Sequence, residues 1–255
     1  MTDGAMYHEG NRRLQDQFDS RRISDRLEEK LTRARFTDDD RAFIENAAYF
    51  FLATADAAGR PDCSFKGGLP GFVRVTGPSE LAFPDYDGNG MFKSLGNILV
   101  NPSVGILFIA MHGKPQRLRV NGEATVSHRD PLLVQTVGAQ LIVRVAARAI
   151  FPNCPRYIPT MQLIEPSKYA PQSGCETPEP AWKDFADFKN YVHPRQPTFK
   201  GSWHPHRGPM AGSGLAALAP LHRSRPTSAF LQPWTYREVR GRCGLSGTVF
   251  QRLAR

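Results

Sequence analysis

The sequence contains no apolar run that approaches the roughly 18–20 residues a membrane-spanning helix requires. Its first fifteen residues, MTDGAMYHEGNRRLQ, also lack the apolar core of a secretory signal. We therefore expect a cytoplasmic protein with no membrane partner. The 255 residues include only four cysteines, and none belongs to a Cys-x-x-Cys pair or lies near a histidine at ligand spacing. This spacing predicts no metal site.

Positive charge is unevenly distributed along the chain. Residues 201–255 contain eight arginines, no lysine and one acid, Glu238, so they carry +7 of the total net charge of +9. The body of the chain is therefore close to balanced. The basic segment lacks regular aromatic interleaving and any recognised nucleic-acid motif. Nucleic-acid binding through this tail is the less favoured alternative, and we expect no nucleic-acid partner.

The N-terminal and C-terminal parts differ from the middle of the chain. Residues 8–34 place apolar side chains at helical spacing with charges between them, so we expect residues 1–36 to form an amphipathic helical segment lying on the body. Proline and glycine become frequent in residues 171–200, an extension with one short helix expected at residues 182–191. Residues 201–255 lose all periodicity, which predicts a disordered basic tail.

Residues 37–170 read as one barrel domain. Thr37 followed by three aspartates is a helix start, with Thr37 as the N-cap and Asp40 at the capping-box position. The short strands that follow are expected at residues 49–55, 61–66, 71–75, 80–83, 104–109, 117–121, 123–127 and 141–151. Many short strands with few helices favour a mainly β barrel over a parallel βαβ sheet.

A glycine-rich turn, GNGMFKSLGN at residues 88–97, directly follows a predicted strand. Its glycines let the backbone approach an anion, and the helix that begins near Met91 offers free N–H groups. Lys93 and Ser94 add a cation and a hydroxyl donor. The pattern indicates a phosphate site that includes Asn89, although a plain helix-start turn with an exposed lysine fits the same residues.

Two further groups of residues qualify as binding candidates. In CSFKGG, Gly67 and Gly68 remove side chains so that a flat ring could lie against the backbone, with Lys66 supplying positive charge. A strand that ends in a Gly-Gly turn is the alternative interpretation. Arg117 and Arg119 share one face of a strand and point either at a bound anion or at solvent.

Taken in order, ATADAAGRPDCSFKGG, LAFPDYDGNGMFKSLGNILVNPSVGILFI and QRLRVNGEATV resemble the pyridoxamine 5′-phosphate oxidase-like family of flavin-binding split barrels. The resemblance covers roughly residues 40–151. It implies a split β-barrel of the FMN-binding type with flanking helices. It also implies a homodimer in which each protomer supplies half of two FMN sites.

The resemblance carries family roles over to particular residues. Lys93 and Ser94 match the pair that holds the FMN phosphate, and Asn97 follows one turn later on the same side as Lys93. The strand that lies along the isoalloxazine ring corresponds to Ser64, Phe65, Lys66 and Gly67. Arg117 stands where family members often have a glutamine near the ring.

The strand around Ser64 lacks the arginine of the authentic oxidase, and no C-terminal Arg-x-His motif is present. Vitamin B6 oxidation is therefore in doubt, whereas flavin binding is not. We expect an FMN-dependent oxidoreductase that uses a small-molecule substrate and an electron donor, with the chemistry supplied by the flavin. The catalytic residues are unknown. The alternatives are a non-catalytic flavin- or haem-binding protein, and use of the deazaflavin F420 in place of FMN.

Overall fold

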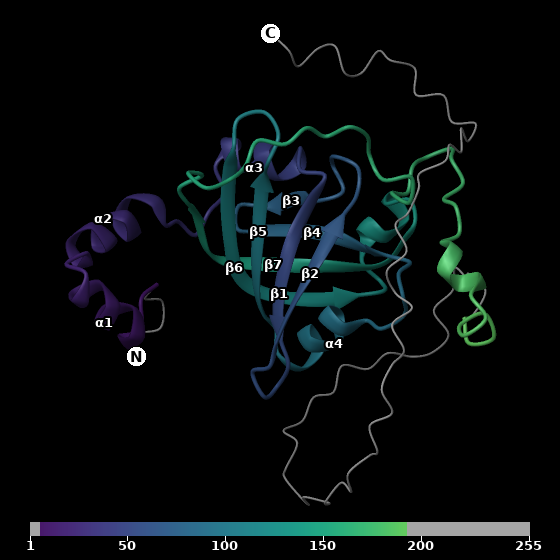
Figure 1. The fold of residues 1–255 in the computed structure, drawn as a ribbon, viewed down its shortest axis with the longest axis horizontal. Helices are drawn as coiled ribbons and strands as arrows, with labels where there is room; N and C mark the ends of the chain where they lie inside the picture. The colour runs from purple at the N-terminus through teal and green to yellow at the C-terminus, as the bar shows by residue number, and fades with distance from the viewer. Residues whose placement is uncertain (1–5, 193–255) are drawn as a thin grey trace, which may run out of the picture. The chain divides into compact units, whose positions relative to one another are not determined.

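The computed structural model describes residues 6–192, which contain a seven-stranded antiparallel sheet (Figure 1). In chain order the strands are β1 (Tyr49–Ala55), β2 (Pro61–Gly67), β3 (Arg74–Gly77), β4 (Glu80–Tyr86), β5 (Ser103–Ala110), β6 (Gln116–Ser127) and β7 (Ala139–Pro152). The helices are α1 (Glu9–Gln17), α2 (Arg21–Leu31), α3 (Asp38–Glu45) and α4 (Lys93–Val100), with 3₁₀ turns η1 (Pro131–Gln135) and η2 (Ala181–Asp184). The strand order in the sheet is β2-β1-β5-β6-β7-β4-β3.

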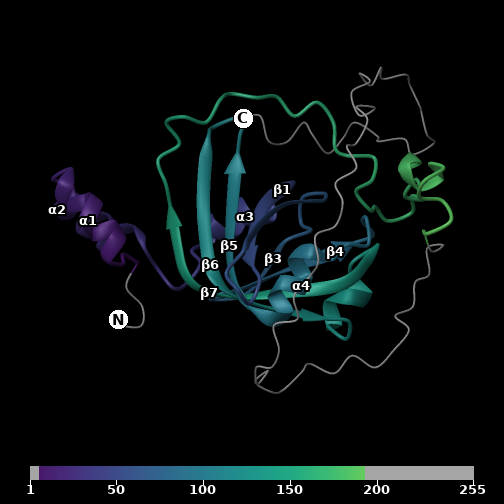
Figure 2. The same ribbon diagram turned by 60° about the horizontal axis from the view of Figure 1, so that its bottom comes forward.

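Aromatic side chains fill the space that the sheet encloses. Phe50 on β1 packs against Phe83 on β4 and Phe108 on β5, with ring centroids 4.9 and 5.3 Å apart, and all three rings are buried. Because β1 and β4 are not neighbours in the sheet, this contact requires the sheet to curl until its two halves face each other, as the second view shows (Figure 2). The predicted mainly β split barrel with flanking helices is confirmed.

The strand β6 joins two segments that the sequence predicts as separate strands. Gly122 lies between them, at a shift in the register of β6 against β7. A Cβ at this position would lie 2.1 Å from the carbonyl oxygen of Ala146, so only glycine allows the two backbones to approach this closely. The strand therefore continues through an irregularity in place of the predicted break.

The predicted start of α3 is confirmed. Thr37 Oγ1 accepts a hydrogen bond from the Asp40 amide at 3.1 Å, and the Asp40 carboxylate accepts one from the Thr37 amide at 2.9 Å. Asp40 is buried and also accepts from Arg33 Nε at 2.8 Å. Arg33 in turn pairs through its backbone with Ile150 of β7, so this polar cluster fastens the N-terminal segment to the sheet.

The N-terminal segment is two helices in place of the single helix expected over residues 8–34. Asp19 adopts a left-handed φ of 48°, a conformation that a continuing α-helix does not contain, and α1 ends just before it. The apolar face expected to lie on the body is uncovered. Between 38% and 74% of each side chain is exposed at Leu14, Phe18, Ile23, Leu27 and Leu31.

The C-terminal expectations have mixed outcomes. The helix expected at residues 182–191 is only the 3₁₀ turn η2 followed by further turns. The disordered tail expected at residues 201–255 lies outside the described residues, and the boundaries of the four proposed parts stay predictions. Within residues 6–192, none of the helices is long and apolar enough to cross a membrane.

We expect Gly122→Ala to lower the free energy of unfolding by more than about 2 kcal/mol, because the new methyl group must displace the β7 backbone. The matched control is Gly96→Ala in α4, where a Cβ would meet no atom within 4 Å and alanine favours the helix. Urea unfolding of the two variants measures the difference. Equal stability of both would contradict the close approach at Gly122.

Candidate functional site

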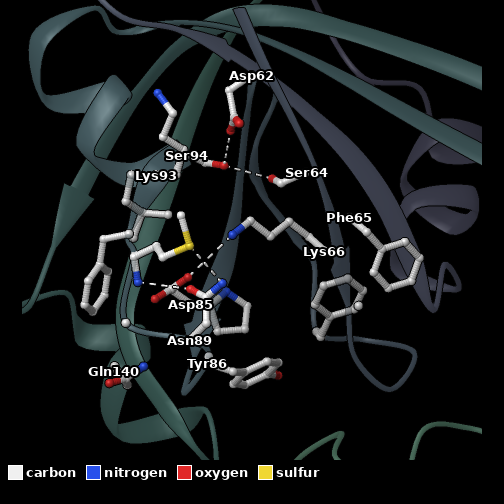
Figure 3. Close-up of a pocket in the computed structure, with 18 residues that line it drawn as sticks. Asp62, Ser64, Phe65, Lys66, Asp85, Tyr86, Asn89, Lys93, Ser94 and Gln140 are labelled. Carbon is white, nitrogen blue, oxygen red and sulfur yellow. Dashed lines mark hydrogen bonds and ion pairs between the residues drawn. The ribbon is translucent and has the colours of Figure 1, made fainter. Parts of the chain in front are cut away.

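A cleft of about 450 Å³ opens along the seam where β2 and β4 approach each other (Figure 3). Its walls come from β2, the end of β4, the loop at residues 87–92 and the first turn of α4. Within the described sheet β2 pairs with β1 alone, so its other edge and the side chains beside it face the cleft. The volume falls in the range of roughly 300–1,000 Å³ that is common for small-molecule sites.

The N-terminus of α4 forms one wall of this cleft. The N-cap residue Phe92 has a left-handed φ of 47° and makes no side-chain capping hydrogen bond. The first amides of the helix therefore receive no cap from that side chain, and they carry the positive end of the helix dipole. The side chain of Lys93 is exposed at the same turn. Backbone and side chain together favour an anion at this end of the cleft.

A hydrogen-bonded chain joins α4 to β2. The buried Ser94 hydroxyl donates to Asp62 Oδ2 at 3.0 Å and lies 2.9 Å from the Ser64 hydroxyl. Asp62, Ser64 and Lys66 occupy alternate positions of β2, so they share the face that looks into the cleft. Asp62 thus brings a negative charge to the turn that otherwise favours anions. The sequence patterns did not single out Asp62, although strand alternation places it on the same face of β2 as Ser64.

An ion pair spans the seam at the opposite end of the cleft. Lys66 Nζ on β2 lies 3.6 Å from Asp85 Oδ1 on β4, and Figure 3 shows the lysine reaching toward the carboxylate. Burial raises the pKa of Asp85 above its ordinary value; Lys66 lowers it in part, and the nearby Asp87 adds to the increase. Asp85 is therefore the carboxyl in this cleft best suited to retain a proton.

Most of the predicted cofactor-binding residues lie together in the cleft. Its lining includes Ser64, Phe65, Lys66, Gly67, Asn89, Met91, Lys93 and Ser94. The structure adds residues that the sequence did not single out, namely Asp62, Asp85, Tyr86 and Gln140. That any of these residues contacts a cofactor stays a prediction.

Two predicted binding residues lie elsewhere. Asn97 is buried on the inner side of α4, where its amide donates to Thr54 Oγ1 at 3.0 Å and fastens the helix to β1. Arg117 on β6 donates to Asn153 Oδ1 at 2.9 Å and does not line the cleft. Helical and strand spacing placed both on plausible faces, but the packing of their elements turned them away from this cleft.

Aromatic rings form an apolar surface at the mouth of the cleft. Phe65 stacks on Tyr49 with centroids 5.5 Å apart and meets Phe51 edge-on at 5.9 Å. Phe65 remains 63% exposed although it belongs to this cluster. The outer face of β1 and β2 therefore presents uncovered apolar area directly beside the site.

Across residues 6–192, no group of three or more histidine, cysteine, aspartate or glutamate side chains is arranged to hold a metal ion. The side chains of the cleft itself include hydroxyls, carboxylates, amides, lysines, a methionine and aromatic rings. Such a mixture suits an organic ligand with an anionic group and a flat apolar part.

The family model for pyridoxamine 5′-phosphate oxidase matches residues 36–166, which is about half of the chain. That segment runs from just before α3 through β7 and contains every residue of the cleft. No curated protein matches the sequence.

Several solved structures resemble the barrel at low identity. HupZ from Group A Streptococcus is 18% identical over 46% of this chain and 93% of its own, with a TM-score of 0.37. A candidate pyridoxamine 5′-phosphate oxidase from Lactobacillus delbrueckii is 22% identical over 47% and 95%, with a TM-score of 0.38. HutZ from Vibrio cholerae, described as a haem storage protein, is 20% identical over 47% and 92%, with a TM-score of 0.33.

We expect the free energy of unfolding to depend on pH through the ionisation of Asp85. The Asp85→Asn variant should lack this dependence. The folded protein binds the Asp85 proton more tightly than the unfolded chain does, so ionising this carboxyl costs the fold stability. As the pH rises from about 3.8 through the raised pKa, the free energy of unfolding of the wild type should fall relative to that of the variant. Urea titrations across this range measure the difference, and parallel curves would contradict the raised pKa.

Proposed function

This chain belongs to the pyridoxamine 5′-phosphate oxidase family, and we propose on that basis that its cleft binds FMN in a homodimeric FMN-dependent oxidoreductase. The substrate and the electron donor are small molecules whose identity the proposal leaves open. The one observation on which the proposal rests most is the uncapped start of α4 inside the cleft. The free amides at a helix N-terminus point toward a bound anion, and an adjacent lysine adds the positive charge that a phosphate monoester needs.

The residues present fit the two ends of FMN. Lys93, Ser94 and the first amides of α4 would hold the phosphate, and Gly90, with a φ of 76°, keeps the approach to those amides free of a side chain. The β2 face around Ser64 and Lys66 would lie along the ring system. FMN, when bound, supplies the two-electron chemistry, while the protein orients it and limits access of water.

Asp85 is our candidate for proton handling at the ring end of the cleft. Its raised pKa favours the protonated carboxyl, and Lys66 lies beside it. Such a pair could hold a proton close to a reacting substrate at pH values where an ordinary aspartate could not. No other role in catalysis is assigned.

The homodimer is proposed from the exposed aromatic surface at the cleft mouth. Phe65, Tyr49 and Phe51 form a cluster that a second copy of the chain would cover, and the same contact would close the cleft beside it. Arg117 lies outside the cleft of its own protomer. Its predicted contact with the ring therefore requires that the second protomer supply it.

Visible absorption of the full-length protein tests FMN binding directly. We expect flavin bands in the purified protein or after FMN is added and free ligand is removed, and bleaching of those bands when NADPH or another donor is supplied. Native mass spectrometry of the same sample should report two chains with two FMN molecules. A protein that stays colourless after incubation with FMN would refute the proposal.

Lys93→Met should weaken FMN binding by about tenfold, because one charged hydrogen-bond donor to the phosphate is lost. Riboflavin, which lacks the phosphate, should bind the variant and the wild type equally. Lys30→Met removes the same charge from α2, outside the cleft, and serves as the control. Flavin fluorescence quenching measures all the affinities. An equal loss of riboflavin affinity would place Lys93 away from the phosphate.

Asp62→Asn should strengthen FMN binding by about fourfold. The asparagine oxygen can still accept the Ser94 hydroxyl, but the negative charge that opposes a phosphate is removed. Riboflavin affinity again serves as the reference, because it should not change. If the substitution weakens FMN binding, the carboxylate holds the serine in a useful orientation and does not oppose the ligand.

A non-catalytic binding protein is the second candidate function. The described lining holds the Lys66–Asp85 ion pair and the Ser94 hydroxyl bonded to Asp62, and both can serve to hold a ligand without turnover, as storage or sensing requires. Bound flavin without turnover of any donor would favour this role. Competition between FMN and F420 distinguishes those cofactors. Haem is the remaining alternative, and an absorption band on haem addition that FMN does not displace would support it.

A further inference from the structure

The chain continues past the barrel into the C-terminal extension, whose described residues 171–192 contact the wall of the cleft from outside. The side chain of Lys183, in the turn η2, is 12% exposed and lies 2.8 Å from Asp87 Oδ2. Glu179 holds the same ammonium at 2.9 Å. Asp87 directly follows β4 and begins the loop at residues 87–92 that leads into α4. Lys183 does not itself line the cleft.

A second contact from the extension lies next to the first. Gly138 precedes β7 with a φ of 76°, and a Cβ there would lie 2.6 Å from Pro171 and 3.8 Å from the Tyr86 ring. Pro171 therefore packs against the backbone immediately behind Tyr86, which lines the cleft. The extension supports the end of β4 at two points, through an ion pair and through close packing.

The loop itself has little to hold it in place. Residues 87–92 are exposed and include two left-handed conformations, at Gly90 and Phe92. Within the loop, the Met91 amide donates to Asn89 Oδ1 at 3.0 Å. An exposed loop of this kind samples several conformations unless contacts with the rest of the chain hold it. α4 anchors one end of the loop and β4 anchors the other, and the Asp87–Lys183 ion pair ties the first residue of the loop to the extension.

We propose that Lys183 is a positioning residue for this loop, and that the extension presets the start of α4 for an anionic ligand. The functional part of the proposal rests on FMN binding in the cleft, whereas the effect on the loop does not. When only a fraction of molecules holds the competent conformation, the apparent affinity falls by that fraction. Releasing Asp87 should therefore weaken FMN binding although no contact with the ligand is removed.

Hydrogen–deuterium exchange of the full-length protein without ligand provides the first test. Lys183→Glu should speed exchange of the Met91 amide, the loop amide that donates to Asn89 Oδ1, and leave the amides of β1 and β5 unchanged. Lys189→Glu, an equal charge reversal at an exposed position of the same extension, is the control. Combining Lys183→Glu with Asp87→Lys restores opposite charges, and Lys183→Arg keeps them, so both should show slow exchange like the wild type.

FMN titration of the same proteins provides the second test. Lys183→Glu should raise the FMN dissociation constant about fivefold, as expected when four in five molecules leave the competent state. The double variant and Lys183→Arg should recover most of this loss. Unchanged exchange of the Met91 amide in Lys183→Glu, or faster exchange throughout the sheet, would overturn the positioning role. Faster loop exchange in a protein that never binds FMN would support it and refute the proposed function instead.

Discussion

The packing of Phe50 against Phe83 joins two strands that exchange no backbone hydrogen bonds, and the rest of the fold depends on it. Burying an aromatic ring of this size contributes roughly 1.5–3 kcal/mol, so the enclosed cluster is a strong reason for the sheet to curl. The curl brings β2 and β4 close without pairing them. What remains between them is a seam. In the described sheet β2 is an edge strand, and β3 pairs with β4 only as far as Ala82, so the end of β4 has no partner on that side.

The charges along this seam explain why it is better suited to an anion at one end than at the other. Asp85 is matched by Lys66 and Asp87 by Lys183, so those two carboxylates contribute little net repulsion. Asp62 accepts a hydrogen bond from a serine hydroxyl of α4 and lies close to the start of that helix. The exposed Lys93 and the helix dipole must outweigh the negative charge of Asp62 for a phosphate to bind. Because these charges oppose one another, we expect a single charge substitution at Lys93 or Asp62 to change the affinity for a phosphate.

Two segments of the chain contribute to the site, one inside the family match and one beyond it. The family match spans residues 36–166 and includes the whole lining of the cleft, whereas Lys183 and Glu179 lie beyond it. The segment inside the family match supplies the shape of the cleft and all of its lining residues. The extension acts on the conformation of one loop, which is where small changes in order have the largest effect on ligand affinity. Under the proposal, this support holds an exposed, glycine-containing turn in a conformation that can bind a ligand.

The sequence alone determined the features that depend on a few adjacent residues. The capping box at Thr37, the positions of most strands and the turn that carries Lys93 and Ser94 follow from local hydrogen bonding, alternation and glycine conformations. Tertiary structure decided the pairings across the seam: Ser94 meets Asp62 across 32 residues, and the ion pair of the extension spans 96. Local periodicity carries no information on such distances, because the curl of the sheet that sets them arises from packing of the whole core.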